Sequence, residues 1–142
     1  MGLNLYIDPG TCSGYAYFEK AVLIACGIFT SDGVRPSATG VEFVVIERPQ
    51  VYPQNPVPAN DLVTLSILVG RLTEFYSSPV CKVEHVLPRA WKGQLPKEVC
   101  WARAAAKLSM AETLIVEQAK LPRSSVHNMR DAVALGIWHS DR

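Results

Sequence analysis

IDPGTCSGYAYF, residues 7–18, is the stretch on which the fold depends, because an apolar segment ends there at a single carboxylate, Asp8. Residues 3–8 (LNLYID) alternate in hydrophobicity, and the alternation resumes over residues 14–19 (GYAYFE) after a Pro-Gly pair. This pattern predicts a β-hairpin. Asp8 has two interpretations at this point: Asp-Pro-Gly is common turn chemistry, and a carboxylate beside glycines can also hold a metal ion or face a phosphate.

Three further strands are expected downstream of the hairpin. Residues 21–29 (AVLIACGIF) continue an antiparallel meander, and residues 41–47 (VEFVVIE) contain the β-branched run expected of a strand buried on both faces. The connection between them, residues 32–40, has room for a turn of helix at most. Residues 80–87 (VCKVEHVL) alternate as a fifth strand.

A proline-rich loop and a helix separate the fourth and fifth strands. Residues 48–60 contain four prolines, too many for regular structure. Asn60 or Asp61 is a suitable cap for the helix that follows. Its apolar residues recur at helical spacing as far as Tyr76, so we expect it to pack on the sheet.

The C-terminal part of the sequence is helical in pattern. A second loop with proline and glycine spans residues 87–96, and a helix is expected over 96–120, broken near Ser109. A last helix begins at Ser124 or Ser125. The order of these elements predicts a mixed α/β sheet with helices on its faces.

Length and composition fit one globular domain over residues 1–142. The net charge is +1, so any surface that binds nucleic acid must be local. The longest apolar run, residues 21–29, is about half of the ~20 residues that span a bilayer. The four cysteines form no C-x-x-C pair. We therefore expect a cytoplasmic protein with reduced thiols and no membrane partner.

Three carboxylates stand where this layout concentrates functional groups: Asp8 ends the first strand, Glu47 ends the fourth, and Asp131 lies in the last helix. If the first and fourth strands are parallel neighbours, Asp8 and Glu47 emerge side by side. Clustered carboxylates repel unless a cation compensates, and oxygen ligands favour Mg²⁺ or Mn²⁺. Two such ions about 3.5 to 4 Å apart can hydrolyse a phosphodiester.

The same three segments, IDPGTCSGYA, VVIE and HNMRDAVA, resemble in order the acidic motifs of RuvC-type Holliday junction resolvases. The resemblance covers most of the chain, including the loop that contains Trp-Lys-Gly after the fifth strand. It implies a ribonuclease H-like fold, with three antiparallel strands plus two further parallel strands. The chain is shorter than typical bacterial resolvases, which favours a compact phage-encoded relative in a bacterial or infected-host cytoplasm.

This resemblance also implies roles for individual residues. Asp8 would bridge two Mg²⁺ ions, for which Mn²⁺ can substitute, while Glu47 holds one ion and Asp131 the other. A further ligand would come from one turn before Asp131. His127 suits this role by its chemistry, and Asn128 by its register.

The resemblance implies branched DNA as the partner and a homodimer as the active form, because symmetric incision of a four-way junction needs two sites related by a two-fold axis. Tyr52 follows Glu47 where the family has an aromatic residue that stacks on an unpaired base. Basic residues near the proposed site are expected to contact phosphates: Arg48, Arg89, Lys92, Lys97 and Arg130.

Other interpretations remain open from the sequence. Glu47 can mark an exposed strand end, Asp131 a solvated helix face, and His127 a helix cap. A catalytically silent ribonuclease H-like module that binds branched DNA or a protein would keep the same fold. The Asp-x-Gly-Thr segment also resembles a phosphate-binding loop of the actin and sugar-kinase superfamily, although that architecture binds ATP between two such domains.

Overall fold

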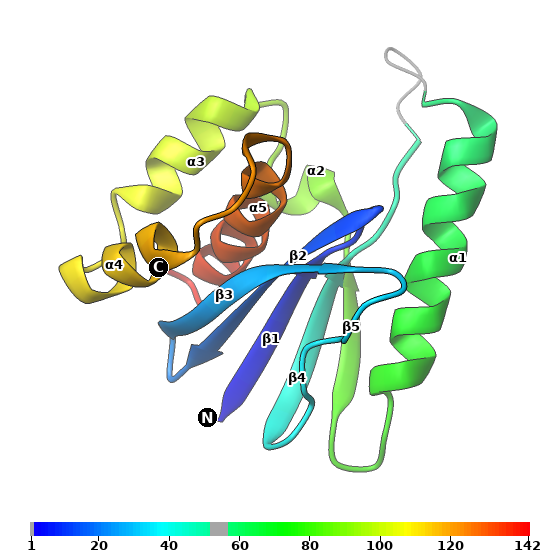
Figure 1. Ribbon diagram of the computed structural model, residues 1–142, viewed down its shortest axis with the longest axis horizontal. Helices are drawn as coiled ribbons and strands as arrows, with labels where there is room; N and C mark the ends of the chain where they lie inside the picture. Colours follow the sequence, from blue (N-terminus) through cyan, green and yellow to red (C-terminus); the bar gives the residue numbers. More distant parts are fainter. Residues whose placement is uncertain (1, 52–56) are drawn as a thin grey trace.

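The computed structural model describes residues 2–51 and 57–142 and is built around a mixed five-stranded sheet (Figure 1). The strands are β1 (Leu3–Asp8), β2 (Cys12–Glu19), β3 (Val22–Thr30), β4 (Val41–Glu47) and β5 (Lys82–Val86). Their order across the sheet is β3-β2-β1-β4-β5. The first three strands are antiparallel, whereas β4 is parallel to β1 and β5 is parallel to β4. The predicted sheet is therefore confirmed.

The parallel pairing of β1 with β4 brings two strand ends together. Ile7 is paired with Ile46, so the next residue in each strand, Asp8 or Glu47, leaves the sheet at the same end. The hairpin partner of Asp8 across β2 is Gly14. Both neighbours of Asp8 in the sheet are thus fixed by backbone pairing rather than by a flexible loop.

The helices lie on both faces of this sheet (Figure 1). They are α1 (Ala59–Tyr76), α2 (Pro88–Trp91), α3 (Lys97–Ala105), α4 (Met110–Gln118) and α5 (Arg123–His139). Figure 1 shows α1 on one side of the sheet and α3, α4 and α5 on the other, with the short α2 near the ends of the strands. This is the layered α/β architecture that the sequence predicted.

Side chains that alternate along the central strands fill two separate cores. Leu5 and Ile7 pack toward α1, whereas Tyr6 between them packs toward α5. In β4 the residues Val44–Ile46 are fully buried, as expected of a strand covered on both faces. Because β1 and β4 are packed on both faces, the positions of their last residues, Asp8 and Glu47, are fixed.

The ends of several helices differ from the sequence prediction. Neither Asn60 nor Asp61 caps α1, which begins one residue earlier behind Pro58, so that prediction was wrong. The loop predicted over residues 87–96 contains the short helix α2, because Pro88 is favourable in a first helical turn. The last helix begins at Arg123, with Pro122 as its N-cap residue, which is earlier than the predicted start at Ser124 or Ser125.

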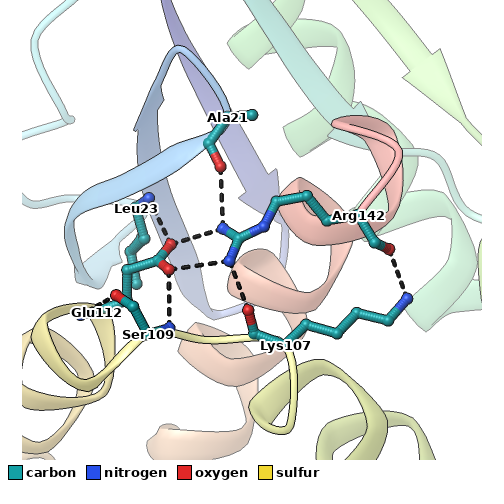
Figure 2. A network of polar contacts seen from close by, with 6 residues as sticks. All are labelled: Ala21, Leu23, Lys107, Ser109, Glu112 and Arg142. Carbon is teal, nitrogen blue, oxygen red and sulfur yellow. Dashed lines mark hydrogen bonds and ion pairs between the residues drawn. The ribbon is translucent and has the colours of Figure 1, made fainter.

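The predicted helix break near Ser109 is confirmed, and its cause is a capping box. Ser109 accepts a hydrogen bond from the backbone of Glu112, while the Glu112 carboxylate accepts one from the backbone of Ser109. Figure 2 shows that Glu112 also binds the Arg142 guanidinium, with N–O distances of 2.7 and 2.9 Å, and the backbone nitrogen of Leu23 at 2.9 Å. The network therefore ties α4 to the β2–β3 hairpin and to the chain after α5.

Glycine at position 14 permits a close approach between α5 and β2. A Cβ atom built on Gly14 would lie 1.9 Å from the backbone oxygen of Asn128 and 2.5 Å from the backbone nitrogen of Met129. Contacts this short are impossible, so only glycine allows α5 to sit at this height above β2. The role of Gly14 in the structure is therefore to let α5 pack closely on β2.

Over residues 2–51 and 57–142, none of the helices has both the length and the hydrophobicity required to cross a bilayer. Each of the four cysteines is a free thiol.

Candidate active site

Three carboxylates from three elements meet at one end of the sheet. Asp8 is the last residue of β1, Glu47 is the last residue of β4, and Asp131 lies on the buried side of α5. Asp8 is 9% exposed and Asp131 is 8% exposed, which is unusual for charged side chains. Because α5 packs directly over β1 and β2, its buried Asp131 is carried toward the two strand ends.

A lysine from α2 and its loop lies between two of these carboxylates. The Lys92 Nζ atom is 3.2 Å from Oε2 of Glu47 and 3.3 Å from Oδ2 of Asp131. The preceding residue, Trp91, donates a hydrogen bond from Nε1 to the same Glu47 oxygen at 2.9 Å. The loop after β5 thus returns to the carboxylates and supplies them with two donors.

Burial and mutual repulsion strongly affect the ionisation of this cluster. Burial raises the pKa of Asp8 well above its usual value, and the charges of Glu47 and Asp131 raise it further. Lys92 and Lys97 act in the opposite direction on Asp8. The two lysines therefore do not fully offset the burial and mutual repulsion of the carboxylates, and ionisation of Asp8 reduces the stability of the fold.

The two groups of the Glu47–Lys92 pair respond differently to burial. Burial raises the pKa of Glu47, and the neighbouring Lys92 offsets only part of this effect. Burial alone would lower the pKa of Lys92, but the attraction of Glu47, Asp131 and Asp8 outweighs it and the pKa is raised. Lys92 accordingly stays protonated as the counter-charge of the cluster.

These residues suit a hard divalent cation by their chemistry, and Lys92 is a cation already placed between two of them. In the described part of the chain, however, no three Asp, Glu, His or Cys side chains are arranged closely enough to hold a metal ion. An ammonium nitrogen lies about 3 Å from its oxygens, whereas Mg²⁺ binds oxygen at about 2.1 Å. The carboxylates are therefore spaced for Lys92 and would have to close around a metal.

The two candidates for a further ligand lie before Asp131 on α5. The His127 side chain is exposed, and Asn128 is half-buried where its backbone packs on Gly14. Neither residue belongs to the contacts that link Lys92 to the carboxylates. Their role as metal ligands stays a prediction.

The basic residues expected to bind DNA occupy different surroundings. Lys92 contacts the carboxylates directly, and Lys97 at the start of α3 is close enough to influence Asp8. The Arg130 guanidinium lies 5.2 Å from the Trp101 ring centre. Arg48 and Arg89 are exposed.

One residue expected to contact DNA, Tyr52, lies outside the described residues. It falls within residues 52–56, between β4 and α1. That Tyr52 stacks on a base therefore stays a prediction.

The sequence did not assign Trp91 to the site, because an isolated tryptophan usually serves as a core or groove-lining residue. Its indole nitrogen proves to be a partner of Glu47. The available signal was topological: a loop that follows β5 starts at the same end of the sheet as Glu47. Trp91 and Lys92 together are therefore part of the site.

Comparisons with known proteins bear on the fold. No protein-family model matches the sequence, and none of the curated proteins matches it. Two solved structures are similar over almost the whole chain. A Thermus thermophilus RuvC structure is 19% identical with a TM-score of 0.55, covering 97% of this chain and 93% of the other. A fowlpox virus Holliday junction resolvase is 14% identical with a TM-score of 0.62, covering 98% and 97%.

These similarities, together with the sheet order, define the class of the fold. The chain has the ribonuclease H-like fold that the sequence predicted, in the form found in the two resolvase structures. The resemblance to RuvC-type resolvases read from three short motifs is confirmed at the level of the fold. A shared fold does not by itself establish the activity of the site.

Proposed function

We propose that this protein is a metal-dependent endonuclease that hydrolyses phosphodiester bonds in branched DNA. The observation that carries this proposal is the convergence of Asp8, Glu47 and Asp131, from three different elements, at one end of a ribonuclease H-like sheet. Buried carboxylates in such a cluster reduce the stability of the fold, which is expected where function requires them. The similarity to two Holliday junction resolvases supports the substrate class.

In this proposal each carboxylate has its own position around the reacting phosphate. Asp8, at the end of β1, would contribute to both metal positions. Glu47 at the end of β4 and Asp131 in α5 would each contribute to one. Mg²⁺ or Mn²⁺, when bound, would supply the positive charge that activates water and stabilises the leaving oxygen. Trp91 would keep the Glu47 carboxylate oriented through its hydrogen bond.

The DNA would approach over the end of the sheet where these residues lie. In this proposal Lys97 at the start of α3 and Arg89 in α2 would contact phosphates of the DNA. Incision of a junction at two symmetric positions would require two copies of the site, so we propose a homodimer. A phage origin would suit the short chain.

One observation favours a second candidate function. The ion pairs of Lys92 with Glu47 and Asp131 neutralise part of the cluster without a metal. A module that binds branched DNA without cutting it would need only this arrangement. The actin-like alternative gains no comparable support from the site.

One experiment separates these candidates. Labelled four-way junction, three-way junction and linear duplex DNA are incubated with the protein in Mg²⁺ or Mn²⁺, alongside Asp8→Asn. Asp32→Asn, an exposed aspartate in the connection before β4, is the matched control. We expect cleavage of branched DNA by the wild type and the control but not by Asp8→Asn. Binding without cleavage would favour the silent module, and equal cutting of linear duplex would contradict junction selectivity.

A further inference from the structure

Lys92 lies between two of the three carboxylates that would hold a metal ion in the proposed function. Its Nζ atom forms ion pairs with both Glu47 and Asp131, at 3.2 and 3.3 Å. The side chains of all three residues are largely buried. Exposed ion pairs contribute little to stability. The ion pairs of Lys92 are different, because its ammonium group is largely buried and is shared by two carboxylates.

An ammonium group and a divalent ion cannot share these oxygens. Mg²⁺ and Mn²⁺ need direct, short bonds to carboxylate oxygens, and two cations in contact with the same two carboxylates would repel strongly in a buried site. Binding of the metal therefore requires Lys92 to withdraw from Glu47 and Asp131. The two states of the site are mutually exclusive.

The local chain permits this withdrawal without disturbing the core. Lys92 follows the four-residue helix α2 and precedes Gly93, whose φ of +60° is readily adopted only by glycine. Residues 93–97 are exposed, so movement there breaks few packing contacts. Trp91 can stay hydrogen-bonded to Glu47 while the flexible lysine stem next to it rotates.

We propose, on the basis of the function proposed above, that Lys92 is an internal counter-cation that the metal displaces, so that this residue sets the metal affinity of the site. In the metal-free protein Lys92 holds Glu47 and Asp131 together. Metal entry exchanges one cation for another, and the competition weakens metal binding. Lys92 is a positioning residue in this account, since it acts through the carboxylates.

The test is a titration of the purified protein with Mn²⁺ alone, in which free Mn²⁺ is followed by electron paramagnetic resonance. Lys92→Met removes the competing charge and keeps the apolar stem. Lys120→Met, at an exposed residue between α4 and α5, is the matched control. We expect Lys92→Met to bind Mn²⁺ at least about tenfold more tightly than the wild type. Lys120→Met should bind as the wild type does.

A second pair of measurements keeps the test decisive if Lys92→Met folds poorly. Lys92→Gln, which retains a hydrogen-bond donor, should also bind Mn²⁺ more tightly, and Lys92→Arg, which retains the charge, should not. In thermal unfolding, Mn²⁺ should raise the melting temperature of Lys92→Gln by more than that of the wild type. Equal or weaker Mn²⁺ binding by both uncharged variants overturns the exchange.

The outcomes also separate this inference from the proposed nuclease function. If the wild type binds Mn²⁺ and cleaves junctions but the uncharged variants bind no more tightly, only the exchange is wrong. If neither the wild type nor the Lys92 variants bind Mn²⁺ and no DNA is cut, the proposed function fails and the exchange with it.

Discussion

Replacement of Gly14 by alanine perturbs the contact that sets the height of α5 above the sheet. The added Cβ would lie 1.9 Å from the backbone oxygen of Asn128 and 2.2 Å from its carbonyl carbon. Both are main-chain atoms, so no side chain can rotate away to make room. The N-terminal half of α5 must therefore move outward, and Asp131 moves with it.

The magnitude follows from the stiffness of packed interiors. Extra methyl groups in a full core cost about 1 to 3 kcal/mol, and a clash with backbone belongs at the upper end, so we expect a loss of about 3 kcal/mol. For a chain of 142 residues this corresponds to a fall in melting temperature of roughly 6 to 12 °C. Junction cleavage should fall as well, because Asp131 moves away from Asp8 and Glu47.

The assay is equilibrium unfolding in urea together with a thermal melt. Gly70→Ala is the matched control, since a Cβ at Gly70 in the middle of α1 meets no atom within 4 Å. Alanine in an open helical position should raise stability by about 0.5 to 1 kcal/mol. The reasoning is refuted if the free energy of unfolding of Gly14→Ala lies within about 0.5 kcal/mol of the wild-type value, since a change of that size is usual for surface substitutions.

Three further predictions concern buried polar groups. Asp8→Asn should raise the melting temperature measured in EDTA at pH 7.5. The pKa of Asp8 is raised by burial and by its neighbouring carboxylates, so the stability of the metal-free protein falls as the pH rises from the ordinary carboxyl pKa through the raised one, and an amide does not suffer this loss. Glu112, 2% exposed, has its pKa lowered from 4.5 to about 2, chiefly by Arg142 against the opposing effect of burial. The ionised Glu112 carboxylate therefore stabilises the fold by about 3 kcal/mol, fully above pH 4.5 and less and less as the pH falls toward 2. In urea unfolding, Glu112→Gln should lower the free energy of unfolding at pH 7 and barely change it at pH 2. Trp91→Phe removes one donor to Glu47 and should slow junction cleavage about tenfold while leaving junction binding unchanged in a gel-shift assay.

Much of the fold was predictable because its signals are local. The alternation before Asp8, the β-branched run before Glu47 and the proline-rich loop between sheet and helix each reflect short-range chemistry. The helix break at Ser109 was also readable, although the residue that completes its capping box, Glu112, was not singled out. The starts of α1 and α5 were misplaced, the four-residue helix α2 was missed, and several strand ends differ by one or two residues from the prediction.

The arrangement of the carboxylates was expected, but their counter-charge was not. Parallel pairing of the first and fourth strands predicts that Asp8 and Glu47 share a sheet end, and the structure has this pairing. The contacts of Lys92 and Trp91 with Glu47 depend on how a loop folds back, which no periodicity encodes. The role of Gly14 escaped prediction for a similar reason, since its partner lies more than a hundred residues away in α5.

The central claim is that Asp8, Glu47 and Asp131 form one nuclease active site, and single-turnover cleavage of a labelled four-way junction in Mg²⁺ tests it most directly. The wild type is compared with Asp8→Asn, Glu47→Gln and Asp131→Asn, each near-isosteric, and with Asp32→Asn as control. We expect each of the first three changes to slow cleavage at least about a hundredfold, as loss of a group that stabilises transition-state charge does, and the control to cleave at the wild-type rate. Cleavage at the wild-type rate by any one of the three carboxylate variants would contradict the claim.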